Sequence, residues 1–376
     1  MFYWLFYEKL FHLYSPFREF FYATFRTAMA SLTALLLSIL LGPWLIGRLR
    51  KFQIGQYIRE DVPQHQKKAG TPTMGGVLIC FSIIVPTLLW ANLHVPAVWV
   101  ALAGLTSFAA IGFWDDYTKV TRKRNLGITG RQKLALQVAA SLLAGFLLLW
   151  MGKHGNYSTN LNVPFMKNFK PDLLIHPLLH NRFTYPFAFV FFFGLVSLVM
   201  VGTSNAVNLT DGLDGLAIGL MIISAGAMTV LAYLSGHAEF AKYLELSRTP
   251  GTTELTIFCG AMTGASLGFL WYNAHPAEII MGDVGALGLG GGLAVVAVLL
   301  KQELLLPFIG GVYVIEALSV ILQVASFKLR GKRIFKMAPV HHHFEKLGWA
   351  ESKIITRFWI AGLILALFAL TTLKLR

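Results

Sequence analysis

The sequence predicts an all-α protein that crosses a membrane about ten times. Its 376 residues are 56% hydrophobic and only 13% charged, and the mean hydropathy is +0.61. A helix that spans a bilayer needs about 20 mostly apolar residues, and ten stretches approach this length. They lie at roughly 20–47, 74–93, 97–114, 134–151, 185–201, 213–234, 254–271, 286–300, 304–327 and 356–373.

The pattern within these stretches argues against an outer-membrane β-barrel. Barrel strands alternate apolar and polar residues over about 10 residues, and the ten stretches do not alternate in this way. A membrane-spanning helix satisfies its backbone hydrogen bonds internally, which a continuous apolar run allows. We therefore expect a helical bundle in which residues 1–376 form one membrane domain.

The distribution of Lys and Arg predicts the orientation. With ten spans, five loops share one side and hold 19 of the 32 basic residues. Because basic loops face the cytoplasm, this side is predicted to be cytoplasmic and both termini periplasmic. The net charge of +14 reflects this bias in part and can also attract anionic lipid or substrate. Without a basic soluble domain, nucleic-acid binding is not expected. The five loops are 48–73, 115–133, 202–212, 272–285 and 328–355.

The cysteines and the N-terminus carry two smaller predictions. Cys80 and Cys259 fall inside predicted spans, so we expect packing residues and no disulfide. The first 18 residues are rich in aromatic side chains and contain no cleavage site typical of a signal peptide. We expect this segment to lie at the membrane interface.

Acidic residues are scarce, yet five of the seven Asp residues gather at the ends of predicted spans. Asp115 and Asp116 follow the third span, Asp211 and Asp214 flank the start of the sixth, and Asp283 precedes the eighth. All five fall on the predicted cytoplasmic side. A carboxylate deep in a bilayer costs at least about 2.5 kcal/mol, which a bound cation would offset. The alternative is a helix end with solvated or capping acids.

The clearest polar pattern lies between residues 205 and 214. Four polar side chains recur every third residue there: Asn205, Asn208, Asp211 and Asp214. In a helix or tight turn this spacing puts them on one face. Amide and carboxylate oxygens are suitable ligands for Mg²⁺. A helix cap requires one such residue and not four in register, so the pattern favours a binding site.

Basic and hydroxyl groups accompany these clusters. Lys68 and Thr73 enter the second span and are suitable phosphate ligands, although an ordinary basic loop has the same composition. Lys119 and Lys133 add positive charge near Asp115.

The longest predicted cytoplasmic loop contains His341, His342 and His343. Three His residues can bind zinc, but consecutive positions seldom converge on one ion and no Cys is near. Hydrogen bonding to a phosphate or sugar is therefore favoured. Glu316, in the middle of the ninth span, is a functional candidate by default, and pairing within the bundle explains it equally well. No role is assigned to Glu316 or to the loop 152–184.

Five motifs in order resemble the polyprenyl-phosphate N-acetylhexosamine-1-phosphate transferase superfamily. The form of the last motif resembles most the branch of bacterial phospho-N-acetylmuramoyl-pentapeptide transferases. Each motif is moderately specific, and their order together with ten spans is very specific. The motifs are KKAGTPTMGG (67–76), FWDDYTK (113–119), NAVNLTDGLDGLA (205–217), MGDVGALGLG (281–290) and APVHHHFEKLGW (338–349).

This resemblance implies a reaction. Undecaprenyl phosphate would attack the β-phosphate of UDP-N-acetylmuramoyl-pentapeptide, which gives lipid I and UMP in peptidoglycan biosynthesis. Phosphoryl transfer requires mainly positioning and charge neutralisation, in agreement with Asp clusters at the height of a lipid phosphate. The resemblance also implies the bacterial inner membrane, an active site that faces the cytoplasm, Mg²⁺ as cofactor, membrane lipid as partner and a homodimer.

The resemblance further implies roles for individual residues. Asp283 is the first choice as Mg²⁺ ligand, with Asp115 and Asp116 near the metal and the lipid phosphate. Together with His342 they form the expected catalytic group. The residues expected to bind substrate are Lys68, Thr73, Lys119, Lys133, Asn205, Asn208, Asp211, Asp214, His341 and His343.

Three other functions fit parts of the sequence. An ion-coupled transporter would place its acids near the bilayer midplane in repeated halves, whereas these acids lie at one face and no repeat is evident. A CDP-alcohol phosphotransferase would carry a D-G-x-x-A-R pattern, which is absent after Asp211 and Asp214. A sister transferase that moves N-acetylglucosamine-1-phosphate to a polyprenyl phosphate is the main alternative, and UMP release with each UDP-sugar distinguishes the two.

Overall fold

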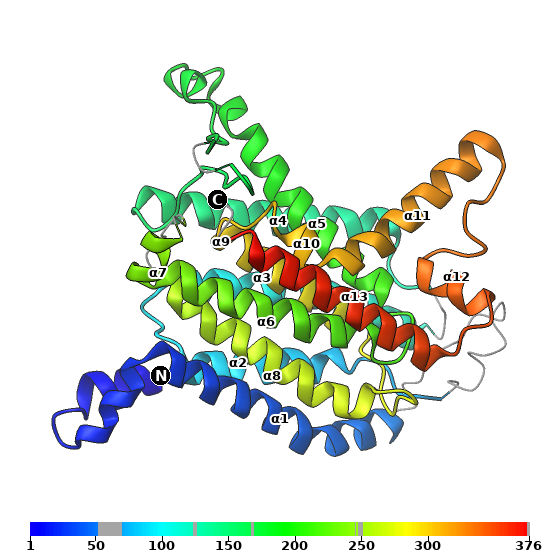
Figure 1. Ribbon diagram of the computed structural model, residues 1–376, viewed down its shortest axis with the longest axis horizontal. Coiled ribbons are helices and arrows are strands. Elements are labelled where there is room, and N and C mark those ends of the chain that lie inside the picture. Colours follow the sequence, from blue (N-terminus) through cyan, green and yellow to red (C-terminus); the bar gives the residue numbers. More distant parts are fainter. Residues whose placement is uncertain (52–69, 123–125, 167–168, 245, 247–250, 374–376) are drawn as a thin grey trace.

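The computed structural model describes residues 1–51, 70–122, 126–166, 169–244, 246 and 251–373. Within these residues the regular secondary structure is helical, and no β-strand is present. The long helices run roughly side by side in one bundle (Figure 1). The all-α membrane fold predicted from the sequence is confirmed.

Each of the ten predicted spans corresponds to an apolar helix in the described part of the chain. Nine of these helices are long and apolar enough to cross a membrane, and α2 is a shorter apolar helix of 15 residues. The ten are α1 Ala23–Lys51, α2 Gly76–Trp90, α3 Pro96–Thr121, α4 Gly130–Lys153, α5 Val190–Thr210, α6 Leu216–Gly236, α8 Leu255–Asn273, α9 Gly282–Leu299, α11 Gly311–Arg330 and α13 Glu351–Thr371. Three short helices are α7 Ala238–Tyr243, α10 Leu306–Ile309 and α12 Val340–Lys346.

Helix α9 lies at the centre of the bundle. Every residue from Val284 to Leu299 is buried, and the helix packs against α3, α5 and α2. A Cβ on Gly76 of α2 would lie 1.9 Å from the Gly285 nitrogen of α9, so the two backbones meet at a distance that only glycine allows. This enclosure fixes the first turn of α9 relative to the neighbouring helices.

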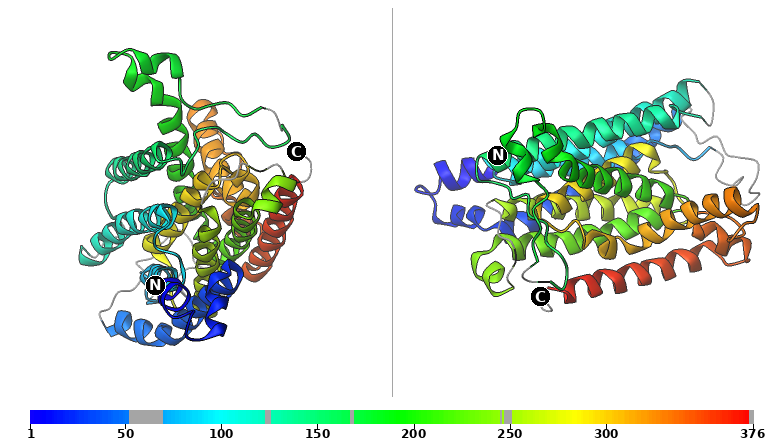
Figure 2. Two further views of the ribbon diagram at one scale, coloured as in Figure 1. Left: turned by 90° about the vertical axis from the view of Figure 1, so that its left-hand side faces the viewer. Right: turned by 90° about the horizontal axis from the view of Figure 1, so that it is seen from above.

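The two ends of the bundle differ. Both termini lie at one end, and α12 lies at the other (Figure 1 and Figure 2). The N-terminal helical turns Tyr3–Lys9 and Ser15–Phe21 project beyond the bundle at the end that holds the termini. The termini therefore share a side, as the count of ten spans requires, while the periplasmic identity of that side stays a prediction.

At the α12 end, the helices extend beyond the apolar stretches of the sequence. Helix α3 continues from the predicted 114 to Thr121, α5 from 201 to Thr210, and α9 begins at Gly282 and not at 286. Backbone hydrogen bonds continue a helix past the point where its side chains become polar. As a consequence, several polar residues that hydropathy assigned to loops stand on rigid helices.

Both cysteines agree with the sequence prediction. Cys80 on α2 and Cys259 on α8 are buried and free. They are therefore packing residues, as expected from their place inside apolar spans.

Candidate active site

Three carboxylates meet at the α12 end of the bundle. Asp115 and Asp116 stand near the end of α3, and Asp283 stands in the first turn of α9. One oxygen from each lies within 4.8 Å of the others. Asp115 and Asp116 are only 4% and 3% exposed. Two of the three Asp clusters in the sequence thus form one group, which we call the acid centre.

Close backbone approach between α3 and α9 builds the acid centre. A Cβ on Gly112 would lie 2.1 Å from the Asp283 carbonyl oxygen. Gly282 has a φ of +72°, and a Cβ there would lie 2.6 Å from Oδ2 of Asp116. The Val284 amide donates a hydrogen bond of 3.2 Å to the same oxygen. The two glycines therefore bring the acids together.

Two lysines compensate the acid centre. Lys119 Nζ lies 2.6 Å from Oδ2 of Asp115 and 3.2 Å from Oδ1 of Asp116. It also lies 3.0 Å from Oδ2 of Asp283, which Lys133 Nζ approaches to 2.7 Å. Three carboxylates thus face two ammonium groups, which leaves one excess negative charge when all are ionised. The Lys119 side chain is 31% exposed, so the group is open to solvent on one side.

The polar residues of α5 divide between two partners. Asn208 Nδ2 donates a hydrogen bond of 2.7 Å to Oδ1 of Asp283 and so joins the acid centre. Asn205 Nδ2 donates to Oε1 of Gln137 on α4 at 2.8 Å. Helix α5 ends at Thr210, so the repeat seen in the sequence does not continue as one face.

Asp211 and Asp214 lie on the linker between α5 and α6, which we call the 211–215 linker. Asp214 Oδ2 accepts a hydrogen bond of 3.1 Å from the Ala277 amide and lies 3.3 Å from Nδ1 of His275. Both partners belong to the segment that leads into α9. The linker is thus fastened to the chain just before Asp283.

His341 is fully buried at the start of α12. Its Nδ1 lies 3.1 Å from Oε2 of Glu316, which is also fully buried. A Cβ on Gly212 would lie 2.3 Å from Nε2 of His341, so the ring packs against the 211–215 linker. Of the two explanations for Glu316, pairing within the bundle is the one that the structure supports.

The other two histidines have different partners. His342 Nδ1 lies 2.5 Å from Oε2 of Glu345, and His343 Nδ1 accepts a hydrogen bond of 3.1 Å from the Lys336 amide. In these contacts each of the three rings has a different partner.

The segment before α2 lies beside the acid centre. The Gly75 amide donates to the Ile280 carbonyl at 2.9 Å. Thr73 Oγ1 lies 3.0 Å from the position that a Cβ on Gly282 would occupy. Lys68, the other residue predicted here, lies outside the described residues.

Sequence reasoning missed several residues near the site. They come from helix interiors, loops and a helix start with no distinctive spacing, and only contacts across the fold reveal them. Asn273 is another buried residue near the site: its side-chain oxygen accepts a hydrogen bond of 3.0 Å from the Gly215 amide, and its amide group donates one of 2.8 Å to the Ile279 carbonyl. The missed residues are Gln137, His275 and Glu351.

The acid centre has the properties of a divalent-cation site. Carboxylate oxygens are the ligands that Mg²⁺ prefers, and the three groups are close enough to share one ion. Lys119 already places a cation against all three. The donor set and the excess negative charge therefore fit Mg²⁺.

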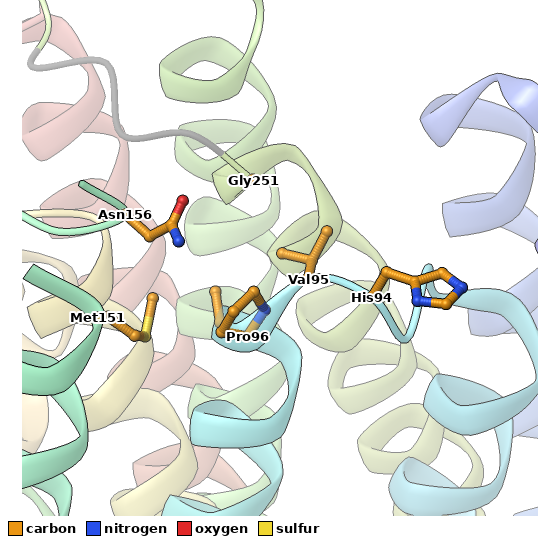
Figure 3. A pocket seen from close by; sticks show the side chains of 7 residues that line it. His94, Val95, Pro96, Met151, Asn156 and Gly251 are labelled. Atoms are coloured by element: carbon orange, nitrogen blue, oxygen red, sulfur yellow. The ribbon is translucent and has the colours of Figure 1, made fainter. Parts of the chain in front are cut away.

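A separate cavity lies at the opposite end of the bundle. Its volume is about 270 Å³. Pro96 begins α3, and the distance from there to Asp115 along the helix is about 28 Å. The cavity is therefore not part of the acid centre. Its lining, shown in Figure 3, consists of His94, Val95, Pro96, Ala97, Met151, Asn156 and Gly251.

The fold and the acid centre together define a multi-pass membrane protein with a cluster of charged side chains at one end of its helices. Residues 98–301 match the model of glycosyl transferase family 4. This region covers more than half of the chain, from α3 through α9, and contains the acid centre, both lysines and the 211–215 linker. The class is thus that of membrane glycosyl transferases.

A more specific match and several relatives narrow this class. Residues 68–80 match the model described as phospho-N-acetylmuramoyl-pentapeptide-transferase signature 1. Proteins of that name from Solibacter usitatus (strain Ellin6076) and Koribacter versatilis (strain Ellin345) are 68% and 64% identical to this chain. One from Acidobacterium capsulatum is 65% identical. All three alignments cover 100% of both proteins. The chain belongs to the phospho-N-acetylmuramoyl-pentapeptide-transferase family.

Proposed function

We propose that this chain transfers phospho-N-acetylmuramoyl-pentapeptide from its UDP derivative to undecaprenyl phosphate, with lipid I and UMP as products. The names of the full-length relatives support this activity. The observation that carries it is the acid centre with its two lysines at the end of membrane helices. Groups of both charges at this height can hold a cation and the phosphate of a lipid at the membrane surface.

In the proposed reaction, an oxygen of the acceptor phosphate forms a bond to the β-phosphorus of the donor. The bond from this phosphorus to the oxygen that bridges to the α-phosphate breaks, and UMP leaves with that oxygen. One phosphoanhydride replaces another, so the step is near-reversible. A phosphate monoester is already mostly ionised at pH 7, with a second pKa of about 6, and a strong general base is not required.

Lys119 and Lys133 would neutralise negative charge on the reacting phosphates. Phosphoryl transfer depends on such preorganised positive charge. Both ammonium groups are held by carboxylates at 3.2 Å or less, which supports a position fixed before substrate binds. Asn208 holds the second oxygen of Asp283 and so orients this carboxylate.

Asp283, together with Asp115 and Asp116, would hold Mg²⁺. Their mutual distances and excess charge support this assignment. When bound, the ion would neutralise charge on the diphosphate of the donor.

The remaining polar residues would bind the donor. Asp211 and Asp214 on the 211–215 linker would contact the nucleotide, and Lys68 and Thr73 its phosphates. His342 and His343 would contact the diphosphate or sugar. Asn205 and His341, which were expected to bind substrate, have a different role in this proposal, because their side chains contact other parts of the protein. Asn205 orients α4 against α5, and His341 positions α12.

The α12 end would face the cytoplasm of a bacterium, with the chain in the inner membrane and both termini periplasmic. The excess of Lys and Arg in loops on the α12 side supports this orientation, as does the cytoplasmic origin of nucleotide sugars. A homodimer is part of the same proposal.

The test measures UMP release by the purified full-length protein from radiolabelled UDP-N-acetylmuramoyl-pentapeptide and, separately, UDP-N-acetylglucosamine. We expect release with the first donor only, and only with Mg²⁺ or Mn²⁺ present. Asp283→Asn should lower the rate by about 10³-fold or more and leave folding and dimer elution unchanged. Asp172→Asn, on an exposed loop, is the matched control with normal activity.

Each part of the proposal has its own contradicting result. Near-normal activity of Asp283→Asn contradicts the metal assignment, and full turnover in EDTA contradicts the requirement for a divalent cation. Release of UMP from UDP-N-acetylglucosamine alone would favour the sister transferase. A monomer in solution contradicts only the dimer.

A further inference from the structure

We propose that Glu351, the first residue of α13, is a positioning residue that holds the 211–215 linker in the shape needed to bind the donor nucleotide. This inference rests on the proposed role of Asp211 and Asp214 in nucleotide binding. None of the motifs that characterise the sequence contains Glu351.

The 211–215 linker is held partly by local backbone hydrogen bonds, among them one of 2.8 Å from the Gly212 amide to the Thr210 carbonyl. Helix α5 ends at Thr210, and α6 begins after Gly215, which has a φ of +78° and offers no capping side chain. The amide groups at the start of a helix require partners from elsewhere in such a case. Just before α6, the amides of Asp214 and Gly215 have partners from distant parts of the chain.

Two side chains supply these partners. Glu351 Oε1 accepts a hydrogen bond of 3.1 Å from the Asp214 amide, and Asn273 Oδ1 accepts one of 3.0 Å from the Gly215 amide. Glu351 is 137 residues away along the chain. The backbone beside the Asp214 carboxylate is thus shaped by α13 and α8.

Glu351 also reaches the segment that leads into α9. Its Oε2 lies 3.5 Å from Nδ1 of His275, and the same ring nitrogen lies 3.3 Å from Oδ2 of Asp214. The Ala277 amide donates to that Asp214 oxygen at 3.1 Å. Glu351 therefore contacts both the linker that carries the proposed nucleotide ligands and the segment that ends at Asp283.

Helix α13, which carries Glu351, packs closely against α6. Trp359 Nε1 donates to the Leu216 carbonyl at 3.4 Å. A Cβ on Gly219 of α6 would lie 2.2 Å from the Trp359 ring, so the two helices are closely packed. Removal of the Glu351 carboxylate should leave this packing intact, while it releases the Asp214 amide and removes the contact with His275.

Glu351, Asp214 and His275 also have the mutual spacing of metal ligands. Two of the oxygens concerned are engaged by backbone amides, Oε1 of Glu351 and Oδ2 of Asp214. These contacts explain the arrangement without an ion, and we assign a positioning role.

The test compares the kinetics of Glu351→Ala, Glu351→Gln and Asp214→Ala in the full-length protein. Loss of a hydrogen bond to a charged acceptor should raise the KM for the UDP-linked donor by about 10-fold or more in Glu351→Ala. The KM for the lipid acceptor and kcat should stay close to wild type. Glu351→Gln keeps a carbonyl acceptor for the Asp214 amide and should restore most of the donor KM.

A second measurement does not depend on turnover. Equilibrium binding of radiolabelled UMP to the solubilised protein should weaken in Glu351→Ala by a similar factor and recover in Glu351→Gln. Asn273→Ala, which frees the adjacent amide, should weaken UMP binding in the same direction. Glu239→Ala, exposed on α7, is the control with unchanged binding. If Glu351→Ala yields no folded protein, Glu351→Asp, which withdraws the acceptor by one methylene, takes its place.

The outcomes separate this inference from the function on which it rests. If Asp214→Ala raises the donor KM and Glu351→Ala does not, the positioning role is wrong and the nucleotide role of the linker stands. If neither variant changes the donor KM, the nucleotide role of the linker is wrong and the inference is lost with it. A fall in kcat and folded yield of Glu351→Ala with normal UMP affinity shows a purely structural residue and also overturns the inference.

Discussion

Buried charges occur at both ends of the bundle, but they are paired differently. At the end that holds the termini, Arg26 binds both carboxylate oxygens of Glu254 at 2.6 and 2.7 Å. Arg26 is 2% exposed and stacks against the Tyr3 ring. At the α12 end, three carboxylates share two lysines, and Lys119 keeps 31% of its side-chain exposure.

A second group of charged side chains near the termini is also buried and paired. Lys301 Nζ lies 2.8 Å from Oε1 of Glu303 and donates to the Tyr157 hydroxyl at 3.1 Å. Burial raises the pKa of the Tyr157 hydroxyl well above its ordinary value, and the Glu303 carboxylate adds to this effect. The hydrogen bond between Lys301 and Tyr157 holds the loop 152–184 against the end of α9.

The difference teaches which buried charges are available for chemistry. A pair in which each charge has one bidentate or enclosed partner is complete and holds helices together. A cluster with unequal numbers of charges and an open side can accept a further cation or phosphate. The acid centre has the second arrangement, and the Arg26–Glu254 pair has the first.

The largest effect on stability is expected from Arg26→Met. The change leaves Glu254 buried without its charged partner, and breaking a buried pair in this way costs about 3–5 kcal/mol. We expect the free energy of unfolding in mixed micelles to fall by this amount, while UMP release per folded molecule stays normal. Arg50→Met, exposed on the same helix, should change neither quantity. A loss of catalytic rate comparable to the loss of stability would remove the distinction between the two ends.

Whereas Arg26→Met should mainly lower stability, Lys119→Met should mainly lower catalytic activity. It removes the cation that contacts all three carboxylates, and loss of a preorganised charge lowers kcat/KM by about 10²–10³-fold. Asp115 and Asp116 keep their backbone donors and Asp283 keeps Lys133, so unfolding should shift less than in Arg26→Met. Lys153→Met, exposed at the far end of α4, is the control for both measurements. A large loss of stability with normal kcat/KM would assign Lys119 to the structural group.

Much of the fold could be predicted because apolar length alone predicts a spanning helix. The ten spans were found in this way, but their ends at the α12 side were not. Asp115 and Asp116 look like loop residues by hydropathy, yet α3 continues through them to Thr121. The same error assigned Asn205 and Asn208 to a loop, although both stand on α5.

The site could be predicted only in part, since spacing along the chain reveals local clusters and not their partners. The family resemblance implied that Asp115 and Asp116 lie near Asp283, and in the structure one oxygen of each carboxylate lies within 4.8 Å of the others. The sequence could not indicate that Glu351 would contact Asp214, because the contact depends on how α13 packs against α6. The equal spacing of residues 205 to 214 was a weaker guide, because α5 ends within it.

Glu316→Gln tests the comparison further, because the Glu316–His341 pair lies at the α12 end, yet both of its members are buried and contact each other like the pairs near the termini. Both side chains are fully buried, and their closest atoms are 3.1 Å apart. The substitution replaces a carboxyl oxygen by an amide group and leaves buried polar groups with poorer partners, which should cost about 1–3 kcal/mol of unfolding free energy. Glu239→Gln, exposed on α7, is the control.

The kinetics of the same variant decide whether the Glu316–His341 pair is structural or takes part in the reaction. His341 lies in the first turn of α12 and packs against Gly212, so its position affects the donor side of the site through other residues. We therefore expect a moderate rise in donor KM and a normal kcat for the protein that remains folded. A fall in kcat as large as that of Lys119→Met, with little change in stability, would place Glu316 among the groups that act on the reacting phosphates. In that case, the burial of both members of a pair would not be enough to identify a structural pair in this bundle, because a fully buried pair would also take part in catalysis.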